Sequence, residues 1–204
     1  VGKYNTTATS IDGFGTVLVS TTLGTSHKKD PENTTLDLVT GMYTTIAKNN
    51  AYGTLKSQET VGESYNRVFD GSTMVNYVVG KYNTTATSID GFGTVMISTT
   101  LGTSHKKDPE NTLLDLVTGR YTTTATNNAY GTLQSQGTVG ESYNRVFDGS
   151  TMVDYVVGRY NTTATSIDGF GTVMISTTLG TSHKKDPENT LLDLVTGRYT
   201  TTAT

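Results

Sequence analysis

Residues 79–95, VGKYNTTATSIDGFGTV, determine how the rest of the sequence is interpreted, because this string occurs three times. It begins at Val1, recurs unchanged at Val79, and recurs at Val157 with Arg159 in place of Lys81. A fixed step between near-identical segments is typical of repeat architectures, in which each repeat packs on its neighbours. We therefore divide the chain into a first period 1–78, a second period 79–156 and a partial third period 157–204.

A shorter step lies inside each period. Tyr82, Tyr121 and Tyr160 follow one another at intervals of 39 residues, and each stands in a similar string, such as GRYTTTAT and GRYNTTAT. The first period accordingly consists of units 1–39 and 40–78. The sequence predicts a structural unit of about 39 residues, present in roughly five copies.

The composition favours strands. The 204 residues include 44 threonines and 22 glycines, only 33% are hydrophobic, and Trp and Cys are absent. Threonine, valine and tyrosine fit a pleated, half-buried surface and lose rotamer freedom in helices. In one unit we expect strands at 151–165 and 172–179, a turn at 166–171 (SIDGFG), and a polar, proline-containing loop at 181–189.

The expected fold is all-β: a tandem repeat of antiparallel two-strand units, forming an elongated array or a fibre-forming sheet or sandwich. Stacked units would bury Val, Ile, Leu and Tyr against their neighbours, while Thr, Asn and Lys face water. Gly80, Gly119 and Gly158 fall within long predicted strands, where glycine often marks a bulge or a bend, so each long segment is expected to divide into two shorter strands that turn a corner.

The first residue gives a further expectation. Val1 corresponds to Val79, which lies within a predicted strand, so we expect the chain to be a piece of a longer array. A strand that starts part-way along its length would leave a sheet edge that a neighbouring copy could fill.

Charge and composition argue against several functional classes. The net charge is −3, with both signs interspersed, whereas a nucleic-acid partner would require clustered basic residues. No apolar run reaches the length of a transmembrane helix, and the absence of cysteine removes disulfides and thiolate sites. We find no catalytic arrangement and expect no enzyme activity and no cofactor. The string GFG at 91–93 has no following helix and is interpreted as a hairpin turn, not a phosphate-binding loop.

The charged strings HKKDPE, at 27–32, 105–110 and 183–188, bring one His and two carboxylates together. Two lysines in each string would repel a cation, so we interpret it as a solvated loop and expect no metal site. Predicted strands also place an Asp among apolar residues, and an Arg five residues further along would be a candidate ion-pair partner if the carboxylate were buried. The three pairs are Asp115 with Arg120, Asp154 with Arg159, and Asp193 with Arg198.

One tyrosine recurs at the same place in each unit, which suggests an aromatic ladder that packs between successive repeats. Its members are Tyr4, Tyr43, Tyr82, Tyr121, Tyr160 and Tyr199. Stacking against sugars is the alternative role. Four Asn-Thr-Thr strings match the acceptor pattern for N-glycosylation, which requires a secretory pathway. Their asparagines are Asn5, Asn33, Asn83 and Asn161. The row Thr122, Thr124 and Thr126 is interpreted as ordinary exposed threonine, with an ice or polysaccharide surface as the alternative.

Repetition of this fidelity would multiply any active site along the chain, so it suits a role that depends on length, surface multiplicity or self-assembly. We therefore expect an extracellular or cell-surface structural or adhesive protein that forms or decorates a fibre or matrix. Its partners would be copies of itself, with glycans or a surface as further partners. The alternatives are a multivalent carbohydrate- or ice-binding array and a closed up-and-down sheet of about ten strands around a small ligand.

Overall fold

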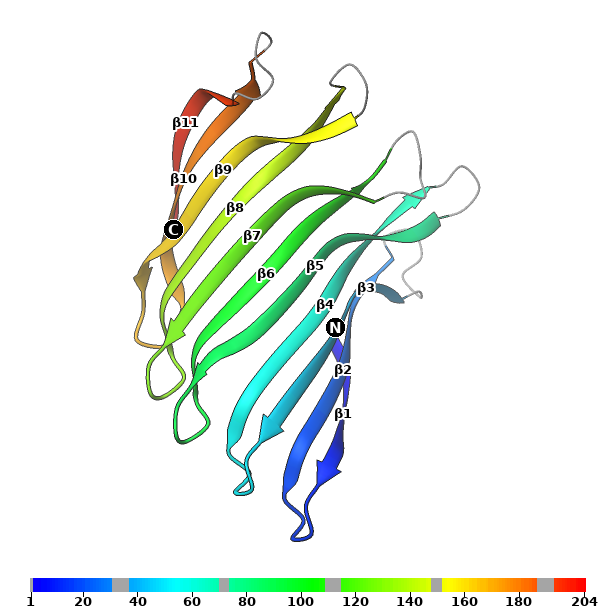
Figure 1. Ribbon diagram of the computed structural model, residues 1–204, viewed down its shortest axis with the longest axis vertical. Coiled ribbons are helices and arrows are strands. Elements are labelled where there is room, and N and C mark those ends of the chain that lie inside the picture. The colour runs from blue at the N-terminus through cyan, green and yellow to red at the C-terminus, as the bar shows by residue number, and fades with distance from the viewer. Residues whose placement is uncertain (1, 31–36, 70–73, 109–114, 148–151, 187–192) are drawn as a thin grey trace.

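The chain forms one open, all-antiparallel sheet. The computed structural model describes residues 2–30, 37–69, 74–108, 115–147, 152–186 and 193–204. Within them, eleven strands pair in chain order, each with the next, and the sheet ends at β1 on one side and at β11 on the other. Figure 1 shows the strands side by side as a single curved layer, from the blue N-terminal strand to the red C-terminal one. The described residues contain no helix that could cross a membrane.

The strands are β1 (Gly2–Ile11), β2 (Val17–Lys29), β3 (Asp37–Asn49), β4 (Leu55–Phe69), β5 (Met74–Ile89), β6 (Val95–Lys107), β7 (Asp115–Asn127), β8 (Leu133–Phe147), β9 (Met152–Ile167), β10 (Val173–Lys185) and β11 (Asp193–Ala203). Four strands make up each 78-residue period, so every 39-residue unit contributes two, and the predicted all-β fold built from antiparallel pairs is confirmed.

The five hairpin turns at the lower end of Figure 1 have the turn chemistry that the sequence predicts. In the turn between β5 and β6, Gly93 has φ of 91°, a conformation that residues with a Cβ rarely adopt. The interpretation of residues 91–93 as a hairpin turn is therefore correct. The loop predicted at 181–189 is partly wrong, because β10 continues to Lys185, while residues 187–192 lie outside the described part of the chain. Thr181 favours a strand because it is β-branched, and the buried His183 shares a hydrogen bond with its hydroxyl.

The prediction that each long segment divides into two shorter strands is wrong. Each strand is continuous, and a β-bulge lies where the corner was expected. In the pairing of β8 with β9, Ser142 lies opposite Gly158 and Tyr143 lies opposite Val156, so Val157 is the extra residue. Equivalent register shifts accompany Gly80 and Gly119. A bulge absorbs one residue by local twisting and bending, which is why the strands curve without breaking.

Cross-strand partners share a face of the sheet, so the register defines complete rows. We call one side the tyrosine face, because it carries an alternating row of tyrosine and glycine across all eleven strands. That row is Tyr4, Gly24, Tyr43, Gly62, Tyr82, Gly102, Tyr121, Gly140, Tyr160, Gly180 and Tyr199. Two residues along each strand, a second row consists of threonine alone, namely Thr6, Thr22, Thr45, Thr60, Thr84, Thr100, Thr123, Thr138, Thr162, Thr178 and Thr201.

The expectation that units bury their aliphatic side chains against one another is wrong. No hydrophobic side chain of the described residues is buried, and Leu101 and Val139 remain 57% and 59% exposed. The reason is geometric: a single layer of strands has no second layer to cover either face. Contacts between neighbouring strands, and not an apolar core, therefore hold this sheet together.

Candidate functional site: the groove face of the sheet

On the tyrosine face, the tyrosine rings cover the glycines of the same row. The Tyr121 ring extends from β7 over β6, where a Cβ added to Gly102 would overlap the ring carbons. The same holds for Tyr43 over Gly24 and for Tyr82 over Gly62. The two remaining pairs are Tyr160 over Gly140 and Tyr199 over Gly180. Each tyrosine thus covers the glycine of the preceding strand, and burial raises the pKa of the Tyr82 and Tyr160 hydroxyls above its ordinary value.

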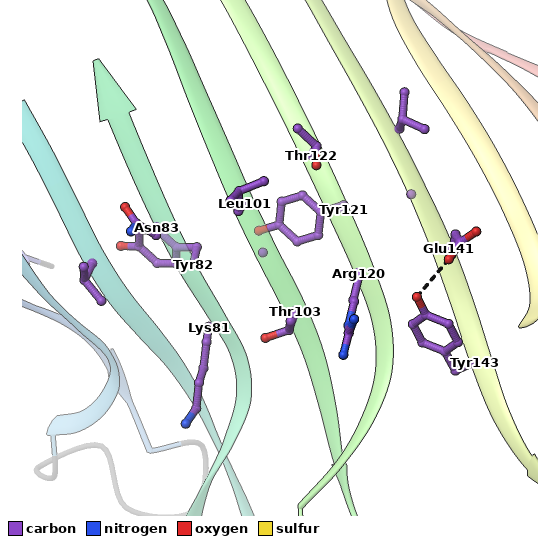
Figure 2. A pocket seen from close by; sticks show the side chains of 14 residues that line it. Lys81, Tyr82, Asn83, Leu101, Thr103, Arg120, Tyr121, Thr122, Glu141 and Tyr143 are labelled. Carbon is purple, nitrogen blue, oxygen red and sulfur yellow. Dashed lines mark hydrogen bonds between the residues drawn. The ribbon is translucent and has the colours of Figure 1, made fainter. Parts of the chain in front are cut away.

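The opposite side, which we call the groove face, is hollowed along the same central row. Its central hollow has a volume of about 720 Å³. The floor is the strand backbone at the Tyr–Gly row, and the walls are the side chains one residue before and one residue after it. One wall includes Lys81 and Arg120, and the other includes Asn83, Leu101 and Val139. Figure 2 labels Lys81, Asn83, Leu101 and Arg120, which lie on three neighbouring strands, β5 to β7.

The first wall carries charged side chains of both signs, with the neutral Thr103 between Lys81 and Arg120. Lys81 Nζ lies 3.5 Å from Glu63 Oε1, and Arg159 Nε donates to Glu141 Oε1 at 2.9 Å. Arg120 carries its guanidinium 5.9 Å from the centre of the Tyr143 ring, and the Tyr143 hydroxyl donates to Glu141 at 2.9 Å, the dashed line of Figure 2. These contacts fix the orientation of long side chains along the groove.

Neighbouring groups shift the pKa of Glu141 and of Tyr143 in this wall. Arg159, followed by the Tyr143 hydroxyl, holds the pKa of Glu141 below its ordinary value, so this carboxylate stays ionised at neutral pH. Burial, together with the bond to Glu141, raises the pKa of Tyr143. At neutral pH this part of the wall therefore pairs an ionised Glu141 carboxylate with a protonated Tyr143 phenol.

The hollow recurs along the groove at the positions that the repeat dictates. A second hollow of about 610 Å³ lies around Arg159, Asn161 and Leu179, and a third of about 560 Å³ lies around Lys3, Asn5 and Leu23. The three hollows share their floor row and their wall rows. What the sheet offers on this face is one extended, repeated groove.

The asparagines of the glycosylation pattern are part of this groove. Asn5, Asn83 and Asn161 line its three hollows, while Asn33 lies outside the described residues. Asn83 is half-buried, and its Nδ2, the atom that a glycan would occupy, donates to Glu59 Oε1 at 2.8 Å. Asn5 and Asn161 are exposed.

The ion pairs differ from those that the sequence suggested. Asp115 pairs with Lys107 across the strands at 2.9 Å, not with Arg120. Asp154 pairs with Arg145 at 2.9 Å, and Arg159 pairs with Glu141 instead. The predicted partners stand five residues apart on one strand, about 16 Å, whereas cross-strand neighbours lie within reach of each other. The side chain of Asp193 lies outside the description.

The HKKDPE strings begin inside strands and not in loops. His105 Nε2 shares a hydrogen bond of 2.8 Å with the Thr103 hydroxyl, two residues earlier on the groove face. Burial, followed by the nearby charge of Lys81, lowers the pKa of His105 below its ordinary value. No group of three potential metal ligands exists among the described residues, and residues 31–36, 109–114 and 187–192 lie outside them.

Sequence reasoning missed both the groove and the complete threonine row. The predicted row Thr122, Thr124 and Thr126 runs along one strand, but the row that spans the whole sheet crosses the strands through Thr123. Within it, Thr123 and Thr138 share a hydrogen bond of 2.8 Å between their hydroxyl oxygens. The sequence analysis aligned unit with unit. Aligning the two strands of one unit with each other would also have revealed the threonine row.

Comparisons with protein-family models, with curated proteins and with solved structures found no match for this chain.

Proposed function

We propose that this chain is a structural repeat protein whose sheet extends by pairing with copies of itself, at the cell surface or outside the cell. The observation that carries the proposal is the Tyr–Gly row: every unit is clamped to the preceding one through a ring such as Tyr121 over Gly102. A sheet stabilised by neighbour contacts can grow strand by strand, because growth requires no new core. The sequon-like Asn-Thr-Thr strings support the extracellular location.

The two sheet edges supply the means of assembly. In the described sheet, β1 and β11 have one neighbour each, and each offers a long strand with few charges. Such edges pair readily with other strands. Because every neighbour is antiparallel, β1 and β11 run in the same direction. Antiparallel edge pairing therefore joins β1 to β1 and β11 to β11 of two-fold related copies, and alternation of the two contacts gives a filament.

Lysines on the edge strands test this proposal. The variant Thr7→Lys with Thr202→Lys places charge on β1 and β11, and the matched control Thr85→Lys with Thr124→Lys changes the equivalent exposed positions of β5 and β7. Sedimentation velocity and negative-stain micrographs should show assemblies for the parent chain and for the control, and dispersed monomers for the edge variant. Monomeric parent chain at all concentrations would refute the proposal.

A second candidate function is multivalent binding of a linear polysaccharide, and the three equivalent hollows along one groove favour it. Repeated weak sites on a rigid support bind a long polymer tightly through avidity. Leu101→Glu with Val139→Glu would obstruct the groove, while Thr85→Glu with Thr163→Glu changes exposed positions on the same face outside the hollow. Affinity electrophoresis in gels containing polysaccharide should show retardation that only the first pair abolishes. Equal mobility of all variants in every gel would exclude this function.

A further inference from the structure

Five aromatic rings stand almost wholly in solvent at one end of the sheet. They occupy the tips of the five hairpin turns that join β1 to β2, β3 to β4, β5 to β6, β7 to β8 and β9 to β10. Their exposed fractions are 99% for Phe14, 92% for Tyr52, and 93% for Phe92, Tyr130 and Phe170. We call this set the aromatic ridge. Rings of this size are normally at least partly covered, so a full set of exposed ones marks an interaction surface.

Each ring is held on a rigid turn. In the first turn, the Asp12 carboxylate accepts hydrogen bonds from the backbone N–H groups of Phe14 at 2.9 Å and Thr16 at 2.8 Å. The Asp12 N–H donates to the Thr16 carbonyl, and the Gly15 N–H donates to the Asp12 carbonyl. The other four turns repeat this pattern, with Asn50 and Asn128 in the place of the aspartate in two of them. In the first turn, the backbone N–H groups of Asp12, Phe14, Gly15 and Thr16 therefore all have partners within the turn.

Neighbouring turns lie close together, so the five rings form one row. A Cβ built on Gly93 would lie 3.2 Å from Thr54 of the preceding turn, and one on Gly171 would lie 3.1 Å from Thr132. Successive tips are two strands apart, which places the rings about 9.6 Å from each other along the line. Figure 1 shows the five turns in sequence along the lower end of the sheet.

The repeat itself indicates that the rings have a role beyond folding. The two kinds of turn differ in sequence, DGFGT at 12–16 and NAYGT at 50–54. The positions kept in both are the hydrogen-bonding Asp or Asn, the glycine with positive φ, the threonine that touches the next turn, and the aromatic residue. The first three have structural functions. The aromatic ring has none within the chain, yet phenylalanine is replaced only by tyrosine.

We propose that the aromatic ridge inserts into the interfacial region of a zwitterionic lipid bilayer. The sheet would then be attached to the membrane surface by the end that carries the five hairpin turns. Aromatic side chains partition into this region, where the turn carbonyls can still reach water, and most N–H groups of the turn backbone are already hydrogen-bonded. The row of separate rings lies along one end of the sheet, where a membrane surface can contact it.

The charges beside the aromatic ridge argue against an anionic membrane and against a second copy of this chain as its partner. Asp12, Asp90 and Asp168 stay ionised because the backbone N–H of Thr16, Thr94 or Thr172, together with further turn hydrogen bonds, lowers their pKa. These three carboxylates would repel an anionic membrane, and they would face one another if the ridges of two copies met. A sugar would need hydrogen-bonding groups beside the rings, but three of the five rings are phenylalanines without a polar atom, and the Oδ1 of Asp12 beside Phe14 already accepts two backbone hydrogen bonds.

Tryptophan reporters test the proposal, since the chain has no tryptophan of its own. Phe92→Trp places the reporter on the ridge, and Leu101→Trp places a matched reporter in the groove. With phosphatidylcholine vesicles, the ridge reporter should shift its emission to shorter wavelength and be quenched by lipids spin-labelled near the headgroup, while the groove reporter should not respond. Binding to phosphatidylglycerol vesicles should be weaker. A ridge reporter that does not respond to lipid would overturn the proposal, as would one that shifts with protein concentration alone.

A five-fold variant provides the second readout. Serine at Phe14, Tyr52, Phe92, Tyr130 and Phe170 should lower the fraction of protein that floats with phosphatidylcholine vesicles by at least tenfold. Circular dichroism should remain that of the parent chain, because the replaced rings make no internal contact that a fold would need. Unchanged flotation of a folded variant would contradict the proposal. Self-assembly through the strand edges should persist in this variant, which separates the lipid contact from the proposed structural function.

Discussion

The Tyr121 ring lies over Gly102 of the adjacent strand, in the space that a side chain on that glycine would fill. The arrangement recurs once in each two-strand unit, and it gives a sheet without a buried apolar core a regular set of close aromatic contacts. Glycine destabilises the interior of a strand because it has no side chain to pack. An aromatic ring that lies across the glycine supplies the missing packing contact.

Substitution of the covered glycine should destabilise the sheet. In Gly102→Ala the new methyl group displaces the Tyr121 ring, and we expect unfolding in urea to show a loss of about 1–3 kcal/mol. Gly137→Ala is the matched control, since the nearest atom to a Cβ there is the Thr162 carbonyl oxygen at 3.9 Å. The control should be neutral or slightly stabilising. Equal losses in both variants would show that the ring is not the cause.

Removal of the ring should cost stability only where it covers a glycine. Tyr121→Ala uncovers Gly102 and should destabilise the chain by about 1–3 kcal/mol, from lost aromatic burial. Tyr4 is 77% exposed on the edge strand, where no preceding strand of this sheet lies beneath it. Tyr4→Ala should therefore cost much less in the same urea titration. If Tyr4→Ala lost as much stability as Tyr121→Ala, the ring would not stabilise the sheet by covering a glycine.

The threonine row should contribute through its hydroxyl groups. Thr123→Val preserves shape and removes the bond to the Thr138 hydroxyl, so we expect a loss of about 0.5–1.5 kcal/mol. Thr124→Val changes an exposed residue of the opposite face and should lie within about 0.5 kcal/mol of the parent chain. Thermal melts of the two variants would compare them directly. A more stable Thr123→Val would show that β propensity outweighs the hydrogen bond.

Acid should weaken the turns that use aspartate. The pKa of Asp12, Asp90 and Asp168 is lower in the folded chain than in the unfolded one, so their contribution is complete above the ordinary value of about 3.9 and is lost as the pH falls through the lowered value. Asparagine fills the same role in the sister turns without titrating. Replacing all three aspartates by asparagine should therefore reduce the fall in melting temperature between pH 6 and pH 2.5. An unchanged fall would assign the acid sensitivity to other carboxylates, such as Asp37 and Glu141.

The sequence predicted what the repeat controls. The 39-residue step, the strand pairs and the turn at residues 91–93 follow from periodicity and turn chemistry, and the structure confirms them. The sequence also predicts one tyrosine per unit that packs between successive repeats, because a recurring aromatic implies a recurring environment.

The features that depend on the neighbouring strand could not be predicted in the same way. That Tyr121 meets Gly102 depends on register, which one strand alone does not contain. The same is true of the Asp115–Lys107 pair and of the central hollow of the groove, whose lining residues come from five strands, β4 to β8. The expectation of buried aliphatic residues failed because alternation predicts two faces but not whether anything covers them.

The central claim is that successive periods lie four strands apart in one open sheet. Spin labels on cysteines at equivalent exposed threonines measure this directly, since the chain has no native cysteine. The pair Thr85 and Thr163 should give a backbone separation of about 19 Å, and the pair Thr7 and Thr163, eight strands apart, roughly twice that distance. A separation for Thr7 and Thr163 equal to or shorter than that for Thr85 and Thr163 would contradict the open sheet.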